Sequence, residues 1–351
     1  MTDLPAYLAL RGTERLLSAL PRGAALALGD LMGRLAHRPL GVRRAAVDEH
    51  LRAAFPDRDP AWRRRVALGC YRHFGRELTA LARLGRTDPE RLAAEASGTD
   101  RVRDLVVDAA ARGPGAVVVT GHLGNWELAG AVLAGLGVRV SAVVKRQGDP
   151  RVHRRLGRLR RGLGVEPVEM REASRRLPEV LRDGGVAALV ADQDAGGKGI
   201  FVPFLGRPAS TFRGPARLAL RHGVPLLFGA LVRDGGGYRA IARRVWDPDA
   251  GPAATDLRGT GLTAADRAAR GTDGERDEAP DAGRPAPEPA AGGKPADRGP
   301  VRRLTLAWTS ILEEEVRDRP EQYFWFHRRW KTRPPRIGAG ADGYPDQESR
   351  G

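Results

Sequence analysis

A histidine and a glutamate five residues apart could carry out acid–base chemistry in this sequence. His122 and Glu127 belong to the run Gly121-His-Leu-Gly-Asn-Trp-Glu127, which directly follows the valine-rich segment 116–120. A histidine can take up a proton near neutral pH when a carboxylate fixes its tautomer and stabilises the imidazolium. The pair corresponds to two members of a Ser-His-Asp arrangement in which the serine is missing.

The missing serine narrows the chemistry that this pair could perform. No Gly-x-Ser-x-Gly sequence occurs in the chain, so a nucleophilic serine of the hydrolase type is not expected. If the hydroxyl of the substrate is itself the nucleophile, the enzyme needs no serine. The reaction is then direct acyl transfer from a thioester to an alcohol.

The two side chains can meet only if His122 lies outside the helix that holds Glu127. Within one continuous helix, residues five apart point about 140° away from each other. We predict a buried strand before the motif, a sharp turn at Gly121, and a helix that begins near Gly124 or Asn125. This places the pair at the carboxyl end of a strand, where open parallel sheets bind ligands. The helix N-terminus adds a positive dipole that can stabilise an oxyanion.

Short apolar runs alternate with helical stretches from residue 101 onward. The runs are rich in valine and bounded by glycine or charge, as buried strands are, and they span residues 116–120, 140–144, 187–191 and 225–232. Helical stretches separate them at residues 127–136, 150–162, 174–183 and 214–222, and residues 238–245 could add an edge strand. This alternation predicts an α/β fold with a mostly parallel central sheet flanked by helices.

Residues 1–100 are predicted to form a helical part that associates with a membrane. The most apolar window, 16–35, contains Pro21, Arg22, Gly23 and Asp30, so it lacks the roughly 20 uninterrupted apolar residues that a membrane span needs. Arginines flank its apolar stretches, as in a helix that lies on anionic headgroups. An ordinary solvated basic face is the alternative interpretation.

Residues 249–300 differ in composition from the rest of the chain. Only two leucines in this stretch are large and apolar. Such a segment cannot bury enough apolar surface to offset the entropy of ordering it, so we predict a disordered insertion. The insertion interrupts one α/β catalytic domain, made of residues 101–248 and 301–336, and residues 337–351 are predicted to be a flexible tail.

The chain is strongly basic and contains a single cysteine. Its 59 lysine and arginine residues exceed its 43 acidic residues by 16 charges, which suits a polyanion such as a nucleic acid or an anionic lipid surface. No recognised nucleic-acid motif occurs, so we expect no nucleic-acid partner. A non-catalytic, basic nucleic-acid-binding protein is the remote alternative. Cys70 alone cannot form an internal disulfide or a cysteine-built metal site, and we predict a small buried helical residue there.

The motif around His122 resembles the active-site motif of the late acyltransferases of lipid A biosynthesis. That family includes the phosphatidylinositol mannoside acyltransferases and is distantly related to the glycerol-phosphate acyltransferases. Three further blocks support the resemblance in the order of the family: Lys145-Arg146 with Pro150-Arg151, the segment 191–206 followed by Thr211, and the aromatic, basic segment 320–334. Together the blocks cover residues 1–336 apart from the insertion.

The resemblance implies a fold like that of the glycerol-phosphate acyltransferases and assigns His122 as general base and Glu127 as its orienting carboxylate. Asp192 and Asp194 follow the next buried strand and would lie on the same sheet edge, so one of them could share the orienting role. The sequence does not say which. The resemblance implies no metal, and we expect no cofactor.

Other residues are candidates for binding substrate. Arg146 and Arg151 could bind a phosphate of the acceptor or of the phosphopantetheine arm of the donor. Asn125, or a backbone N–H, could donate a hydrogen bond to the oxyanion. Because an acyl carrier protein is acidic, the basic surface would assist its docking.

The resemblance implies transfer of a fatty acyl chain from an acyl carrier protein, or from coenzyme A, to a hydroxyl of a glycolipid. We expect the acceptor to be a lipid A precursor, with a phosphatidylinositol mannoside as the alternative. Glu127 favours the lipid A precursor, because the actinobacterial phosphatidylinositol mannoside acyltransferases usually have aspartate at that position. The expected location is the cytoplasmic face of the inner membrane, as a peripheral or monotopic protein.

Overall fold

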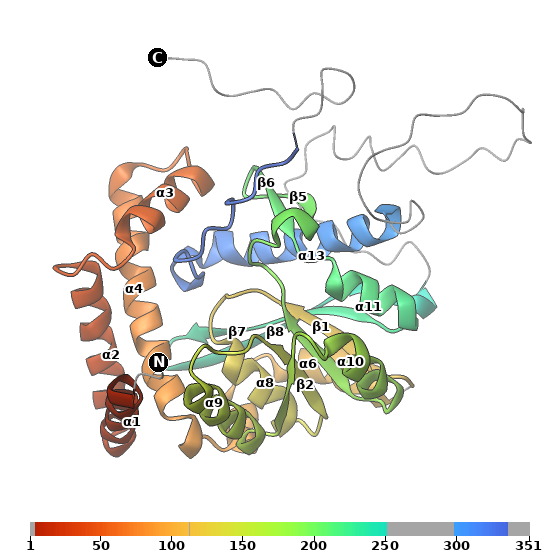
Figure 1. Cartoon of the computed structure of the whole chain (residues 1–351), viewed down its shortest axis with the longest axis horizontal. Coiled ribbons are helices and arrows are strands. Elements are labelled where there is room, and N and C mark those ends of the chain that lie inside the picture. Colours follow the sequence, from red (N-terminus) through yellow and green to blue (C-terminus); the bar gives the residue numbers. More distant parts are fainter. Residues whose placement is uncertain (1–3, 112, 251–297, 336–351) are drawn as a thin grey trace, which may run out of the picture.

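A six-stranded sheet forms the centre of the structure, a computed structural model that describes residues 4–111, 113–250 and 298–335 (Figure 1). The strands lie in the order β3-β2-β4-β1-β7-β8. The first five are parallel, and β8 runs antiparallel to β7. Their bounds are Ala116–Thr120 (β1), Val140–Val144 (β2), Val165–Glu169 (β3), Val186–Val190 (β4), Leu226–Asp234 (β7) and Gly237–Trp246 (β8). The predicted α/β fold with a mostly parallel sheet flanked by helices is confirmed.

The sheet separates two hydrophobic cores. In β1, Val117 and Val119 pack into the first core, whereas Ala116 and Val118 pack into the second. This division follows from the strand geometry, in which successive side chains point to opposite faces. All five residues of β1 are buried, so helices must cover both faces of the sheet.

The N-terminal region is helical, as predicted. Four helices, α1 (Leu4–Ala19), α2 (Arg22–His37), α3 (Arg44–Ala54) and α4 (Pro60–Ala82), lie to the left of the sheet in Figure 1. Shorter helical segments then lead to β1: η1 (Leu84–Arg86), α5 (Pro89–Glu95), α6 (Thr99–Val102), η2 (Arg103–Val107) and α7 (Asp108–Ala111). The apolar window 16–35 is divided between α1 and α2. Within the described ranges, no helix has the length and apolarity that crossing a membrane requires.

Helix α2 packs closely on α4 because glycines line their contact. A Cβ atom added at Gly75 would lie 2.1 Å from the carbonyl oxygen of Gly29, and one added at Gly33 would lie 2.2 Å from that of Tyr71. Larger side chains there would push the helices apart. Cys70, also on α4, is free and buried, which confirms the prediction of a small buried helical residue.

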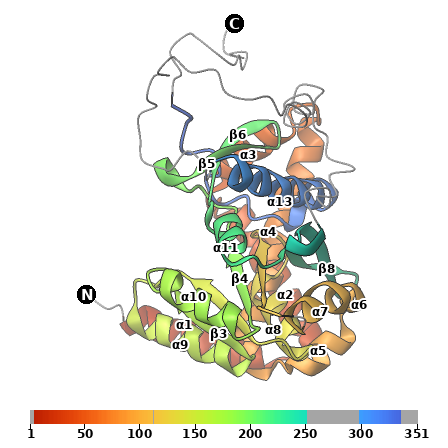
Figure 2. The same ribbon diagram turned by 90° about the vertical axis from the view of Figure 1, so that its right-hand side faces the viewer.

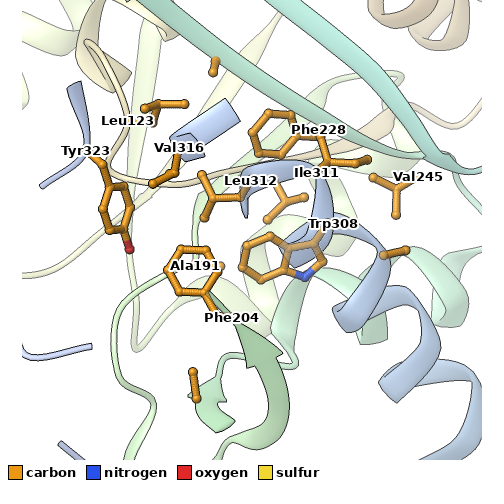
Figure 3. Packing of buried hydrophobic residues seen from close by; sticks show 14 of the residues in the cluster. Leu123, Ala191, Phe204, Phe228, Val245, Trp308, Ile311, Leu312, Val316 and Tyr323 are labelled. Carbon is orange, nitrogen blue, oxygen red and sulfur yellow. The ribbon is translucent and has the colours of Figure 1, made fainter. Parts of the chain in front are cut away.

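Helices cover the two faces of the sheet in separate groups. Helices α8 (Trp126–Gly135) and α9 (Pro150–Gly162) join α5, α6 and α7 around the second core. Helices α10 (Ala173–Arg182), α11 (Gly214–His222) and α13 (Arg298–Asp318) cover the first core (Figure 2). Figure 3 shows Trp308, Ile311 and Leu312 of α13 beside Phe228 and Val245 of the sheet.

Strand β3 and one hairpin are absent from the predicted elements. β3 reads Val165-Glu-Pro-Val-Glu169, and its proline and two glutamates hide the strand pattern. A proline is tolerated there because β3 is an edge strand. The hairpin pairs β5 (Ile200–Phe204) with β6 (Arg207–Thr211) in antiparallel register. Three short 3-10 turns complete the described elements: η3 (Gly196–Lys198), η4 (Pro248–Ala250) and η7 (Pro320–Gln322).

The predicted insertion and tail fall almost wholly beyond the described ranges. Of residues 249–300, the structure describes 249–250 and 298–300, and residues 337–351 lie outside the description altogether. The disorder predicted for both segments, and the domain boundaries drawn at them, stay predictions.

Candidate active site

The structure has the predicted strand, turn and helix around the motif. Strand β1 ends at Thr120, His122 lies in the turn, and α8 begins at Trp126 with Glu127 in its first turn. Asn125 is the N-cap of this helix, where its side-chain oxygen accepts a hydrogen bond from a backbone N–H at 2.9 Å. His122 therefore lies between the end of β1 and the start of α8, outside the helix and at the edge of the sheet.

The turn itself is tied down on two sides. Gly124 has a φ of +63°, a region that favours glycine, and a Cβ there would lie 2.1 Å from the carbonyl oxygen of Leu231. Its N–H donates to the carbonyl of Gln322 at 2.9 Å, and the N–H of Asn125 donates to that of Leu231 at 2.8 Å. Strand β7 and the C-terminal segment thus hold His122 in place.

Asp192 is the carboxylate that contacts His122. The ring Nδ1 of His122 and Oδ1 of Asp192 are 2.6 Å apart, and the backbone N–H of His122 donates to Oδ2 at 2.9 Å. Asp192 lies two residues beyond the end of β4, and β4 pairs with β1 in the sheet. Strand adjacency therefore brings together two residues that are 70 positions apart in the sequence.

The surroundings of Asp192 keep its carboxylate ionised. Burial alone would raise the pKa of this group, which is 2% exposed. Attraction to His122 and the two hydrogen bonds from that residue outweigh burial, and the pKa of Asp192 is lowered below its usual value. Arg329, also buried, contributes in the same direction. Burial and the nearby Asp192 carboxylate raise the pKa of Tyr323, so its hydroxyl remains protonated.

The second ring nitrogen of His122 is the atom available for chemistry. With Nδ1–H donating to Asp192, Nε2 carries the lone pair that can accept a proton. The side chain of His122 is 18% exposed. The side-chain amide nitrogen of Gln193 lies 3.3 Å from Nε2. Gln193 was not singled out in the sequence, although it stands directly after Asp192.

Glu127 has a different partner. Arg160 of α9 forms a bidentate ion pair with its carboxylate, with nitrogen–oxygen distances of 2.8 and 2.5 Å. Among the hydrogen bonds and ion pairs of the described residues, none joins Glu127 to His122. The structure therefore brings Asp192 to the imidazole, while Glu127 links the first turn of α8 to α9.

Asp194 ties the C-terminal segment to the site. Its carboxylate accepts hydrogen bonds from the hydroxyl of Thr332 at 2.8 Å and from the backbone N–H of Gly196 at 3.3 Å. Its own N–H donates to Nε2 of His327 at 2.9 Å. These contacts give Asp194 a place in the framework around Asp192.

The candidate substrate-binding residues lie in three different settings. The side-chain amide of Asn125 is buried and donates to Glu77 at 2.6 Å. Arg146 is exposed just beyond the end of β2, on the same sheet edge as His122. Arg151 lies in the first turn of α9, and its Nη1 is buried without a hydrogen-bond partner.

A buried polar cluster centred on Glu77 supports the turn that carries His122. No local sequence pattern predicts this cluster. The carboxylate of Glu77 on α4 receives hydrogen bonds from Nε of Arg233 at 2.7 Å, the hydroxyl of Tyr238 at 2.8 Å and the amide of Asn125 at 2.6 Å. Burial raises the pKa of Tyr238, and burial lowers that of the adjacent His73 to about 4. The helix N-cap beside His122 is thus anchored to α4 and to the β7–β8 hairpin.

Aromatic rings form an apolar wall beside the imidazole. The ring centre of Trp126 lies 4.7 Å from that of His122, and that of Phe324 lies 5.9 Å away. Phe74 and Phe326 extend the wall, at 5.1 and 5.2 Å from Phe324. Trp126, Phe324 and Phe326 are partly exposed, so an apolar chain could lie against them.

The site is thus a histidine–aspartate pair at the carboxyl ends of two parallel strands in an α/β fold. The family model described as bacterial lipid A biosynthesis acyltransferase matches residues 5–246 and 292–332, and the chain belongs to that family. Phosphatidylinositol mannoside acyltransferases of Mycobacterium tuberculosis are 31% identical over 194 residues, which is 54% of this chain and 57% of theirs. That of Mycolicibacterium smegmatis is 31% identical over 166 residues, 46% of this chain and 53% of its own. The chain thus matches about half the length of these relatives.

Proposed function

We propose that this chain transfers a fatty acyl group from a thioester to a hydroxyl of a membrane glycolipid, with His122 as the general base. The observation that carries the proposal is the pair of His122 Nδ1 and Asp192 Oδ1, 2.6 Å apart at the carboxyl ends of β1 and β4. This pair leaves Nε2, whose contact in the structure is the side-chain amide of Gln193 at 3.3 Å, to act on the substrate, and no enzyme nucleophile is required.

The reaction proceeds in two steps, addition of the acceptor oxygen to the thioester and collapse of the tetrahedral intermediate. Nε2 of His122 takes the proton of the acceptor hydroxyl while the oxygen forms a bond to the thioester carbonyl carbon. Asp192 stabilises the imidazolium that results. The tetrahedral oxyanion then collapses, the carbon–sulfur bond breaks, and the imidazolium returns the proton to the leaving thiolate. Once Nε2 is protonated it no longer accepts a hydrogen bond from the amide of Gln193, 3.3 Å away, and that amide is then available to donate to the oxyanion.

The apolar wall beside His122 suits the acyl chain. Partly exposed aromatic rings, such as Trp126 and Phe324, provide a surface from which a fatty chain displaces water. A small acetyl group would leave most of this wall uncovered. The wall therefore favours a long-chain acyl donor, carried by an acyl carrier protein or by coenzyme A.

A mannosylated phosphoinositide is the acceptor that the comparisons favour. The proteins from Mycobacterium tuberculosis and Mycolicibacterium smegmatis that match the chain are named phosphatidylinositol mannoside acyltransferases. A lipid A precursor, the acceptor expected from Glu127, is the second candidate, and the description of the family supports it. Both acceptors are glycolipids of a membrane, so the enzyme would act at the cytoplasmic face of the inner membrane.

Transfer assays test the proposal directly. Purified protein is supplied with radiolabelled palmitoyl-coenzyme A or palmitoyl-acyl carrier protein, and with either a phosphatidylinositol mannoside or a tetra-acylated lipid A precursor. We expect labelled product from the mannoside, lost in His122→Ala and retained in His222→Ala, a histidine at the end of α11. Product from the lipid A precursor alone would move the assignment to the second candidate. Full activity of the His122→Ala variant would contradict the role of His122 as the general base.

A further inference from the structure

A cavity lies at the outer edge of the sheet, where α9, β3 and the start of α10 meet. Its volume is about 470 Å³, a size typical of sites for small molecules. The residues that line it are largely charged, and five of them are arginines: Arg154, Arg158, Arg160, Arg161 and Arg176. Arg146 and Arg151, the arginines singled out in the sequence, are not among its lining residues.

Each of the three carboxylates that line the cavity lies near a cation, and that of Glu172 is 4.0 Å from Nε of Arg171. Glu166 pairs with Arg161 at 3.0 Å. Glu169 pairs with Arg171 at 3.0 Å and with His153 at 3.2 Å. Five arginines and three glutamates line the cavity, so the charge of its lining is net positive.

Two of the arginines that line the cavity, Arg154 and Arg158, have no such partner among the described residues. Arg154 and Arg158 occupy successive turns of α9, both are exposed, and neither takes part in a hydrogen bond or ion pair among the described residues. Like charges at this spacing destabilise a helix. Nε of Arg176 is buried without a hydrogen-bond partner and forms an ion pair with Glu179 at 3.8 Å. A bound anion would offset the charges of Arg154 and Arg158 and give Nε of Arg176 a hydrogen-bond acceptor.

The cavity is connected to the catalytic residues. Arg160 lines it and holds Glu127, the neighbour in α8 of Trp126, whose ring packs on His122. The last residue of β2, Val144, also lines it. β2 and β4 are adjacent in the sheet, and strands lie about 4.8 Å apart. His122 follows β1, on the other side of β4, so the end of β2 at the cavity is two strand spacings, about 10 Å, from the end of β1.

We propose that this cavity binds a phosphate group of one of the two substrates, an inference that rests on the proposed acyl transfer. Guanidinium groups bind phosphate oxygens with strong, charge-assisted hydrogen bonds. The nucleotide phosphates of an acyl-coenzyme A donor and the phosphodiester of a mannosylated phosphoinositide share this chemistry. Arg154, Arg158 and Arg176 are the ligating side chains.

Binding of inorganic pyrophosphate, measured by calorimetry, tests the site independently of catalysis. Each charge-assisted hydrogen bond contributes substantially to the binding free energy. We therefore expect the affinity of the double variant Arg154→Ala/Arg158→Ala for pyrophosphate to be at least about tenfold lower than that of the wild type. The matched control, Arg302→Ala/Arg303→Ala, removes two exposed arginines of α13 on the other face of the sheet. Equal affinity in the wild type and the first variant would overturn the proposal.

Steady-state kinetics then identify the source of the phosphate. If the donor supplies it, the first variant raises the KM for palmitoyl-coenzyme A about tenfold and leaves that for palmitoyl-pantetheine, which has no phosphate, unchanged. If the acceptor supplies it, the KM for the mannoside rises instead. Unchanged KM values for both substrates would refute a substrate subsite. An inactive wild type would refute the proposed function, while the pyrophosphate measurement would still decide whether the site binds phosphate.

Discussion

Asp192 is the residue on which the activity of His122 should depend most. The replacement Asp192→Asn keeps the shape of the side chain but removes the charge that stabilises the imidazolium. We expect kcat to fall about a thousandfold, with little change in KM. Because the pKa of Asp192 is lowered, its carboxylate is ionised at all neutral pH values. The loss should therefore be similar between about pH 6 and pH 9.

The same assay separates Asp192 from the other carboxylates. Asp194→Asn, which alters contacts to Thr332 and Gly196 and not to His122, serves as the matched control. A kcat for Asp192→Asn within tenfold of the wild type would show that another group orients the imidazole.

Glu77 should matter for stability as well as for the shape of the turn. The replacement Glu77→Gln leaves Arg233, whose side chain is 9% exposed, without its counter-charge. Breaking a buried pair in this way costs about 3 kcal/mol in the free energy of unfolding. Tyr238→Phe removes one hydrogen bond to the same carboxylate and should cost about 1 kcal/mol. Urea denaturation of both variants measures their free energies of unfolding, and we expect the larger decrease in Glu77→Gln. Equal decreases in the two variants would contradict this prediction.

The sequence predicts which residues lie near the site better than it predicts which of them contact one another. His122, Asp192 and Glu127 all follow from strand ends and helix starts. Which carboxylate meets the imidazole depends on the order of β1 and β4, and a single sequence does not contain strand order. Glu77 and Arg233 are 156 positions apart, and no local pattern joins them.

At the scale of elements, α4 links the N-terminal helices to the catalytic turn. It packs backbone to backbone on α2 and carries the carboxylate that holds the N-cap of α8. Asp30 of α2 strengthens the contact, because it pairs with Arg72 and Arg76 of α4 at 2.8 and 2.6 Å, and with Arg34 of its own helix at 2.8 Å.

This cluster predicts a stability that depends on pH. Burial alone would raise the pKa of Asp30, but the three arginines outweigh it and lower the pKa to about 2. In the unfolded chain the pKa is near 3.9. The stabilisation by Asp30 is therefore fully present above about pH 4 and is lost as the pH falls toward 2. Asp30→Asn should lower Tm at pH 7, and the difference from the wild type should shrink as the pH falls below 4.

A second carboxylate provides the control for this measurement. Asp48 of α3 has a side chain that is 40% exposed, and within the described ranges its carboxylate forms an ion pair with Arg44 alone, at 3.6 Å. Because exposed pairs contribute little, Asp48→Asn should change Tm only slightly at any pH. A pH-independent difference for Asp30→Asn would show that its effect is not electrostatic.

The elements themselves were predictable where apolar residues are dense. Strands β1 and β2 and helices α9 and α11 have the bounds expected from the sequence. Such runs are unambiguous because a buried strand or helix requires apolar residues at fixed spacing. β3 and the β5–β6 hairpin contain prolines and are partly exposed. Tertiary contacts, rather than local pattern, keep these segments extended.

At the scale of the whole molecule, the first helices expose an apolar surface that the rest of the fold leaves uncovered. Leu8 and Leu16 of α1 and Leu31 and Leu35 of α2 are between 45% and 59% exposed. Exposed arginines lie among them, including Arg22. An apolar surface bordered by arginines complements a bilayer with anionic headgroups. We therefore predict that α1 and α2 dock on the membrane that contains the acceptor.

Flotation with vesicles tests this docking. The double variant Leu31→Glu/Leu35→Glu places charges where leucines would enter the bilayer, and burial of two leucines is worth about 3 kcal/mol or more. Binding to vesicles that contain phosphatidylinositol should weaken at least about tenfold, whereas Met170→Glu, an equally exposed site after β3, should bind like the wild type. Neutral phosphatidylcholine vesicles should bind the wild type more weakly, because they lack the charge that attracts the arginines. Equal binding of the wild type and the leucine variant would place the membrane contact elsewhere on the molecule, and the acceptor would then have to reach His122 from another side.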